Sequence, residues 1–475
     1  MDVRYGFFVG LTACRKYRFF LPMLVGLGNL VPLKINDMTA KKTPIEKLIA
    51  PVNRFIHLEY TSGIVLLLSV VAAILWANLA PEGFHHVWET NFSISFDGHS
   101  LSHPVHSWIN DGLMAVFFFV IGLELKREFM DGELSTVRKA MLPMGAALGG
   151  MVVPALLYVV INLSSGAGHG WGIPMATDIA FALALLSMAG KHVPTSVKVF
   201  LSALAVADDL GAVLVIAFFY TAQVNFTALA IAGIFLVVLM IGNKMGVRSS
   251  LFYLLLGIGV WAGFLLSGVH ATIAGVLVAF TIPAVTRIDE TVYSDKLKKL
   301  THEFEKEIPS NSTLTTPQQH QTIQHVKSLS MAAETPLQKI EYSLHPWVAF
   351  AIMPLFALAN SGILIGSNFF NSIVNPVSIG VAVGLVAGKF VGILLFSWLM
   401  VKLGMGALPQ EANWRHMIGV ALLGGIGFTM SLFISGLAFS NPEFIDQAKY
   451  GILIGSVIAG VLGSLVLRNS GKSRS

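Results

Sequence analysis

Two adjacent carboxylates, Asp208 and Asp209, stand in the middle of an apolar run that covers residues 199–220, VFLSALAVADDLGAVLVIAFFY. No other acidic or basic side chain occurs between Lys198 and Lys244, so the charges that balance this pair must come from a distant part of the chain. An ionisable group at bilayer depth is costly, and proteins keep such groups facing a bundle interior, where they bind ions, protons or substrates. The pair therefore predicts a functional site inside a membrane.

The composition agrees with a membrane protein. The chain has 475 residues, of which 55% are hydrophobic and 12% charged, and this balance is typical of an all-α polytopic membrane protein. The net charge of +5 is explained by basic loops at span ends and does not predict a nucleic-acid partner. Cys14 is the only cysteine, which excludes an intrachain disulfide, a cysteine zinc site and an iron–sulfur cluster.

Apolar runs of suitable length predict about twelve spans. Their ranges are 61–80, 108–125, 140–162, 173–189, 199–221, 227–243, 249–266, 269–285, 346–364, 377–402, 413–439 and 447–467. The connecting segments alternate between those rich in Lys and Arg and those with almost none. By the positive-inside rule, this alternation predicts that both termini are cytoplasmic.

Five parts follow from this pattern. Residues 1–53 are expected to be a cytoplasmic amino-terminal extension, because their apolar patches are too short and interrupted to span. Residues 54–285 hold eight spans, and 344–470 hold four. The polar segment 286–343 between them is predicted to be a flexible cytoplasmic loop without chemistry of its own. Residues 471–475 are predicted to be a cytoplasmic tail.

A short extracytoplasmic segment, 91–102, has the sequence NFSISFDGHSLS. Its polar and apolar residues alternate around Asp97-Gly98, a dipeptide favoured in two-residue β-hairpin turns. An isolated hairpin is only marginally stable, and its open edge can pair with a second copy of the chain. We expect a homodimer contact here, although a hairpin that packs on its own subunit explains the pattern equally well.

Only a few charges lie inside the other apolar runs. Asp178 is alone between Lys139 and Lys191, and Lys389 is alone between Glu341 and Lys402. Asp178, the Asp208-Asp209 pair and Lys389 thus place three carboxylates against one ammonium group. The cluster comes close to neutral when one carboxylate is protonated or binds a monovalent cation. A further acid, Asp111, begins the second span.

The adjacent aspartates cannot share one partner equally, because neighbouring helical residues point about 100° apart. One of them can face Lys389 while the other faces an aqueous funnel, and the sequence leaves open which is which. Such different surroundings make the two carboxylates hold protons differently. Na⁺ and Li⁺ prefer oxygen ligands, so they compete with the proton for the same atoms. This competition is the minimum chemistry of an antiporter.

Two of the predicted spans are interrupted. Pro174 and the pair Thr177-Asp178 fall within the fourth span, and three glycines between residues 424 and 427 fall within the eleventh. Interruptions at matching places of two halves predict inverted repeats, here spans three to five and ten to twelve, whose half-helices meet at the bilayer midplane. Asp178 is suited to the positive half-helix N-termini, and Lys389 to the negative C-termini.

Several motifs together make this chain resemble the NhaA-type sodium/proton antiporter family. They are WINDGLMAVFFFVIGLELKRE, GGMVVPALLY, ATDIAFAL, ALAVADDLGA, SGVHATIAGV, LHPWVA, PLFALANSG, the AGK of the tenth span, and GGIGFTMSLF. The resemblance covers residues 54–470 essentially without interruption.

The resemblance implies a pH-regulated, electrogenic exchanger in a bacterial inner membrane, which extrudes sodium or lithium by alternating access and is driven by inward proton flow. It needs no cofactor besides the transported ions. By motif match, Asp208 and Asp209 are the sodium and proton carboxylates, and Lys389 is their positive partner. Thr177 and Asp178 belong to the crossing of the broken fourth helix.

The resemblance also implies a cytoplasmic pH-sensing region. Its residues are Glu124, Lys126, Arg127, Glu128, Glu341 and His345. The chain departs from the family pattern at Tyr342, where His is frequent, and at Phe390, where Pro is frequent. The long 286–343 segment and the extra residues 1–45 are further departures. Tyr342 and the long segment make the pH profile differ from the family pattern, because they change the titrating groups at the cytoplasmic end. His270 is interpreted as a hydrogen-bonded packing residue more than as a sensor.

Other functions with buried charges fit less well. An intramembrane aspartyl protease needs two aspartates that face each other from different helices, and Asp208 and Asp209 are adjacent, so we do not expect an enzyme. A channel needs no internal balance of Lys and Asp. A cation-coupled symporter of an organic solute is the nearest alternative, but it needs a polar and aromatic pocket, whereas the interrupted spans offer small residues around carboxylates.

Overall fold

A computed structural model provides the fold. It describes residues 61–96, 99–189, 193–221, 224–306, 315–365 and 373–470. The expectations for the extension 1–53 and for the tail 471–475 lie outside the described residues.

In these described ranges, ten helical segments are long and apolar enough to cross a membrane. Five consist of one helix each, namely α2 (Thr61–Leu79), α6 (Val137–Ile161), α8 (Thr195–Phe219), α9 (Phe226–Lys244) and α10 (Ser250–Ser267). A sixth single helix, α21 (Pro442–Ser470), ends the bundle. The polytopic all-α prediction is confirmed.

The other four spans contain an irregular turn. Three of them have π-helical turns: α4–η3–α5 (Val105–Ser107, Trp108–Leu113, Met114–Asp131), α14–η5–α15 (Pro336–Trp347, Val348–Ile352, Met353–Asn360) and α17–η6–α18 (Pro376–Val383, Gly384–Gly388, Lys389–Lys402). The fourth joins the 3₁₀ helix η4 (Gly168–Met175) to α7 (Ile179–Met188). An eleventh span is the bent pair α19 (Trp414–Leu423) and α20 (Phe428–Ala438), whose axes differ by 44°.

The expected span over 269–285 is shorter than a full crossing. Its helix α11 covers only the ten residues Thr272–Thr281. Ile282 is extended, with ψ of 132°, because Pro283 disfavours the helical conformation of the residue before it. At the other side, Gly268 ends α10 in the left-handed region, with φ of 79°.

The two interrupted spans cross at their breaks, as the sequence predicts. The backbone N–H of Asp178, which precedes α7, donates to the carbonyl of Ile426 between α19 and α20, with an N···O distance of 2.6 Å. The glycines make this approach possible. A Cβ at Gly425 would lie only 2.4 Å from the Leu385 carbonyl oxygen, and one at Gly427 only 2.8 Å from that of Ala176.

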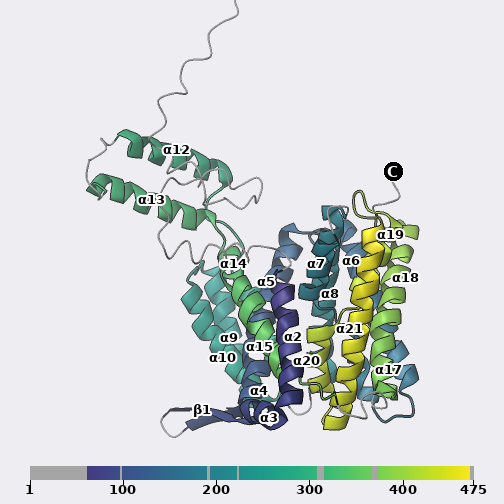
Figure 1. The fold of residues 1–475 in the computed structure, drawn as a ribbon. Helices are drawn as coiled ribbons and strands as arrows, with labels where there is room; N and C mark the ends of the chain where they lie inside the picture. The colour runs from purple at the N-terminus through teal and green to yellow at the C-terminus, as the bar shows by residue number, and fades with distance from the viewer. Residues whose placement is uncertain are drawn as a thin grey trace, which may run out of the picture. The chain divides into compact units, whose positions relative to one another are not determined.

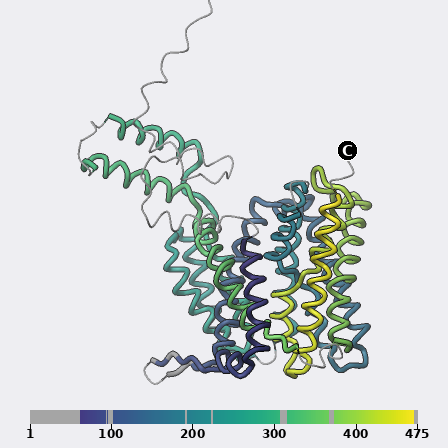
Figure 2. The backbone as a smooth tube through the Cα atoms, viewed as in Figure 1, coloured from purple at the N-terminus to yellow at the C-terminus, as the bar shows by residue number. Residues whose placement is uncertain are grey.

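The helices gather in two groups (Figures 1 and 2). One contains α6, α8, α17, α18, α19 and α21, and the other contains α5, α9, α10 and α11. Aromatic rings join helices in the core between distant parts of the chain. The Phe433 ring on α20 lies 5.6 Å from Phe118 on α5 and 6.2 Å from Phe356 on α15, between ring centroids.

The predicted hairpin is confirmed. Strands β1 (Asn91–Phe96) and β2 (His99–Pro104) are antiparallel, and the register pairs Phe96 with His99. The expected Asp97-Gly98 turn lies outside the described residues. The Trp108 indole donates to the Phe92 carbonyl at 3.0 Å and so ties β1 to the start of the second span. A short helix, α3 (Pro81–Glu89), precedes the hairpin.

The segment 286–343 differs from the expected flexible loop. It contains the helices α12 (Glu290–Lys306) and α13 (Pro317–Ala333), which run side by side in Figure 1. Leu297 on α12 and Val326 on α13 are buried, and such widely spaced apolar residues suffice when two helices cover each other's narrow apolar face. The ninth span also begins earlier than expected, at Pro336 after the N-cap Thr335.

Gly392 on α18 offers a test of the packing of α18 against α6, because its backbone lies directly against that of Gly149 on α6. A Cβ at Gly392 would lie 2.1 Å from the Gly149 carbonyl oxygen, so Gly392→Leu must push the two helices apart. We expect a loss of about 1–3 kcal/mol or more of stability, measured as a lower thermal unfolding midpoint in detergent. Gly233→Leu on α9 is the matched control, since a Cβ there meets no atom within 4 Å. Equal midpoints would contradict the assigned contact.

Candidate cation and proton site

Four buried charged side chains surround the crossing. Asp178 precedes α7, Asp208 and Asp209 lie on the unbroken α8, and Lys389 begins α18. Lys389 is 0% exposed and each of the three aspartates 1%. Because desolvated charges are stable only with partners, the contacts of these groups indicate which charges are balanced.

Lys389 is paired with Asp208. Its Nζ forms a short ion pair with Asp208 Oδ2 and also donates to the Thr177 hydroxyl at 3.0 Å. The Thr177 hydroxyl in turn lies 2.7 Å from Asp208 Oδ2. The structure therefore answers the question that the sequence leaves open: Asp208 is the aspartate that faces the lysine.

Thr177 also connects this ion pair to the other broken span. Its hydroxyl oxygen lies 2.8 Å from the carbonyl oxygen of Gly424, just after α19. A hydroxyl carries one proton, so it donates fully to either Asp208 or Gly424 but not to both. Lys389 thus reaches the negative carbonyl end of α19 through Thr177 and makes no direct contact of its own with that helix end.

The Asp178 carboxylate accepts hydrogen bonds from both broken spans. Its Oδ1 accepts from the Phe181 N–H in the first turn of α7, at 3.2 Å. Its Oδ2 accepts from the Thr429 N–H in the first turn of α20, at 3.1 Å, and from the Thr429 hydroxyl. Helix N-termini carry partial positive charge. One carboxylate therefore offsets two half-helix ends, and little of its charge is left over.

Asp209 forms no ion pair with a described residue, unlike Asp208. Its Oδ1 is buried and accepts no hydrogen bond from a described residue, a property that it shares with Asp208 Oδ1. Carboxylate oxygens without protein donors are suited to a proton or to a hard cation such as Na⁺ or Li⁺. The expected aqueous funnel beside the second aspartate stays a prediction.

Most of the expected pH-sensing residues form a second cluster, between α5 and α14. Arg127 forms a short ion pair with the buried carboxylate of Glu341, and it lies 3.6 Å from Glu128. His345 Nδ1 lies 3.7 Å from Glu124 Oε1. These contacts connect the second span to the ninth.

Lys126 lies apart from this cluster. Its Nζ donates to the carbonyls of Phe280 at 2.7 Å and Ile282 at 2.5 Å. These atoms form the C-terminal end of α11, where a cation is favourable. Its contacts therefore give Lys126 the role of a helix cap.

The remaining titratable residues named above lie elsewhere. His270 Nε2 is 3.0 Å from the carbonyl oxygen of Tyr220, and this hydrogen bond fits a packing residue. Asp111 lies in the π-helical turn at the other end of the second span from Arg127, where its carbonyl accepts from the Trp261 indole at 2.8 Å.

Thr429 is not among the site residues predicted from the sequence, although it donates twice to Asp178. A usable signal was present, because Thr429 follows the three glycines that break the eleventh span. A polar residue in the first turn of a half-helix is in position to bind the group that neutralises the helix end.

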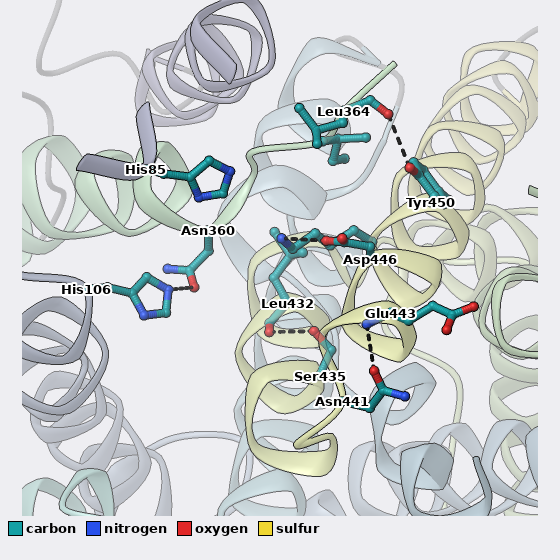
Figure 3. Close-up of polar contacts among 12 residues, drawn as sticks. His85, His106, Asn360, Leu364, Leu432, Ser435, Asn441, Glu443, Asp446 and Tyr450 are labelled. Carbon is teal, nitrogen blue, oxygen red and sulfur yellow. Dashed lines mark hydrogen bonds and ion pairs between the residues drawn. The ribbon is translucent and has the colours of Figure 1, made fainter. Parts of the chain in front are cut away.

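Figure 3 shows polar contacts near the ends of α4, α15 and α21. His106 on α4 bonds the Asn360 side chain at the end of α15, with a 3.0 Å separation, and the Tyr450 hydroxyl on α21 donates to the Leu364 carbonyl at 3.1 Å. None of these residues belongs to the predicted site. They connect α4 to the end of α15, and α21 to the segment that follows α15, at the opposite end of the ninth span from Glu341.

An apolar bundle with two crossing broken helices and buried charges at the crossing defines a secondary ion transporter. The family model described as Na⁺/H⁺ antiporter 1 matches residues 53–467. The chain belongs to the NhaA family of Na⁺/H⁺ antiporters.

Individual relatives are similar in sequence to this chain over most of its length. The Na⁺/H⁺ antiporter NhaA of Oleidesulfovibrio alaskensis is 46% identical over 431 residues, which are 90% of this chain and 96% of that relative. The Na⁺/H⁺ antiporter NhaA 1 of Psychromonas ingrahamii is 48% identical over 417 residues, 87% of this chain and 95% of that relative.

Lys389→Ala is predicted to destabilise the protein, because it leaves Asp208 as a buried charge without a cation. Removing one partner of a buried pair typically costs ~3–5 kcal/mol. Asp208→Asn in the same chain should restore part of that loss, whereas Asp209→Asn should restore less. Thermal unfolding of the single and double variants in detergent measures these differences. Equal rescue by both aspartate changes would contradict the assigned pair.

Proposed function

We propose that this membrane-embedded chain is a sodium/proton antiporter that exchanges its ions at the Asp208-Asp209 pair. It is a multi-pass transporter and not an enzyme, in keeping with its family. The observation that carries the assignment of the site is the unequal pairing of two adjacent buried carboxylates, since only Asp208 has the Lys389 ammonium as its partner.

The charges around the crossing support an exchange of one ion for another. The Asp208–Lys389 pair is neutral, and Asp178 is offset by two helix N-termini. One negative charge is then left on Asp209. A proton or a Na⁺ ion neutralises it equally well, and both at once would leave an excess positive charge in a desolvated site. Each ion therefore displaces the other.

Electrogenic exchange needs a second proton for each sodium ion. Lys389 can supply it, because its ammonium group is stabilised in the buried site by Asp208 and the Thr177 hydroxyl. A sodium ion that also binds Asp208 weakens the ion pair between Asp208 and Lys389, and Lys389 can then release a proton. The same pair takes the proton back when the sodium ion leaves.

Alternating access would use the crossing as its pivot. The half-helices on the two sides of the breaks are joined by a few hydrogen bonds through Thr177, Asp178 and Thr429. Movement of one helix group against the other around a fixed site opens that site to one side at a time. The ion bound at Asp209 biases the balance between the two states by its differential affinity.

The cluster of Arg127, Glu128, Glu341, Glu124 and His345 would regulate this exchange. Protonation of Glu341 or Glu124 removes an attraction that holds α5 to α14, and protonation of Glu128 removes a second carboxylate from Arg127. A change of a few kcal/mol is enough to shift a two-state equilibrium. Lys126, which caps α11, would act through the position of that helix and not as a titrating group.

Orientation and assembly complete the proposal. The alternation of basic and uncharged loops supports an orientation with both termini in the cytoplasm, in the inner membrane of a bacterium. A homodimer would form through the 91–102 hairpin, because a two-stranded sheet leaves its outer edges unpaired. The Trp108–Phe92 hydrogen bond instead favours packing on the same subunit for one end of β1.

Asp209→Asn is predicted to reduce exchange to the background of vesicles that lack the protein, because an amide can neither exchange a proton nor supply the negative charge. The assay is Na⁺-induced proton release in everted vesicles with a pH-sensitive dye. Glu443→Gln is the control, since this acid is exposed at the start of α21. Control-level exchange by Asp209→Asn across the active pH range would refute the assignment.

Glu341→Gln, Glu124→Gln and Glu128→Gln are predicted to shift the pH at which exchange turns on, with the maximal rate retained. Losing an ion pair of this kind corresponds to roughly half a pH unit. The measurement is exchange rate against pH, normalised to the amount of protein. Glu334→Gln is a nearby control whose side chain forms no ion pair with a described residue. Superimposable profiles for all three variants would refute the regulatory role.

A further inference from the structure

An open groove of about 420 Å³ lies between α12 and α13. Its less exposed lining residues are apolar and form its floor: Ile288, Leu300, Leu329 and Ala332. Its exposed lining residues are polar and form its rim: Lys296, Lys299, Glu303, His325 and Ser328. Pockets for small organic ligands have this size and this mixture of an apolar wall with a few polar groups.

Two ammonium groups on the rim are available to an anion. Lys296 and Lys299 are three residues apart, so they lie on the same face of α12, and neither forms an ion pair with a described residue. Lys298 on a different face lies 3.9 Å from Asp295. Lysine ammonium groups bind phosphate as point charges.

The rest of the groove selects more than a bare anion. Glu303 lies one helical turn beyond Lys299 on the same rim, where its carboxylate repels a second phosphate-sized anion and accepts hydrogen bonds from hydroxyl groups. Leu300 and Leu329 between the rims offer an apolar surface to a flat ring. Phosphate, hydroxyls and an apolar ring occur together in a nucleotide.

We propose that the α12–α13 groove binds a soluble nucleotide. The phosphate lies between Lys296 and Lys299, the sugar hydroxyls face Glu303, and the base covers Leu300 and Leu329. The volume of the groove accommodates a ligand of this size.

The base of the groove is connected to the proposed pH-sensing cluster. The Arg287 N–H donates to the Ala332 carbonyl at 3.0 Å, and the Arg248 guanidinium donates to the carbonyls of Val285 at 3.1 Å and Glu334 at 2.8 Å. The chain then enters α14, whose Glu341 pairs with Arg127. A ligand that changes the spacing of α12 and α13 therefore acts on the first turn of α14. This regulatory step rests on the proposed function, whereas the binding site does not.

Binding of AMP and GMP to the purified full-length protein tests the site. Isothermal titration calorimetry in detergent, with adenosine and inorganic phosphate as the incomplete ligands, is expected to show saturable binding of at least one nucleotide and weaker binding of both parts. Lys296→Ala/Lys299→Ala should weaken nucleotide binding by about tenfold or more, since each lost ammonium removes a charge-assisted contact.

The matched control is Lys298→Ala/Lys306→Ala, which removes two positive charges from the same helix outside the groove. Unchanged affinity in this control supports the site. The absence of nucleotide binding to the unmodified protein, an equal loss in both double variants, or binding of inorganic phosphate as tight as that of the nucleotide would each overturn the proposal.

Exchange in everted vesicles tests the regulatory step separately. Nucleotide added to the exposed cytoplasmic face should shift the pH profile of exchange in the unmodified protein and in Lys298→Ala/Lys306→Ala, but not in Lys296→Ala/Lys299→Ala. A profile that nucleotide leaves unchanged, in vesicles that do exchange sodium for protons, would refute the regulatory step alone.

Discussion

The cost of holding a lysine away from water is the constraint on which this structure depends. Lys389 is fully buried at the start of α18, and Asp208 on α8 is the carboxylate that compensates it. Leaving either charge without the other would cost ~3–5 kcal/mol. Thr177 adds a hydrogen-bonding oxygen to both members of the pair. A threonine can reach this position only because the fourth span is interrupted there.

The interruptions place backbone polar groups at bilayer depth, where each must find a partner inside the protein. Asp178 satisfies the N–H groups at the start of two half-helices, and its own N–H donates to Ile426. Gly425 and Gly427 allow the backbones to approach closely enough for these bonds. The broken helices and the buried charges are thus parts of one network, and among the described residues Asp209 is the aspartate of this network that forms neither an ion pair nor a hydrogen bond to a helix N-terminus.

The charge cluster between α5 and α14 lies at a point where two parts of the chain meet. Arg127 and Glu341 connect a bundle helix to the helix that follows the α12–α13 pair. A titration within the cluster and a change within the helix pair would act on the same short segment. This arrangement gives the α12–α13 pair a physical connection to the Arg127–Glu341 ion pair at the start of the ninth span.

The sequence by itself determined the membrane class, eleven of the spans, both breaks and the identity of the buried charges, because bilayer burial leaves unambiguous apolar runs and makes each internal charge conspicuous. Only the tertiary structure decided that Asp208 and not Asp209 faces Lys389, since adjacent residues on a helix are equivalent until the neighbouring helices are placed. It likewise showed Thr429 as a partner of Asp178 and α12 packed on α13. Polar contacts and narrow apolar faces depend on residues far apart in the chain, which no local pattern records.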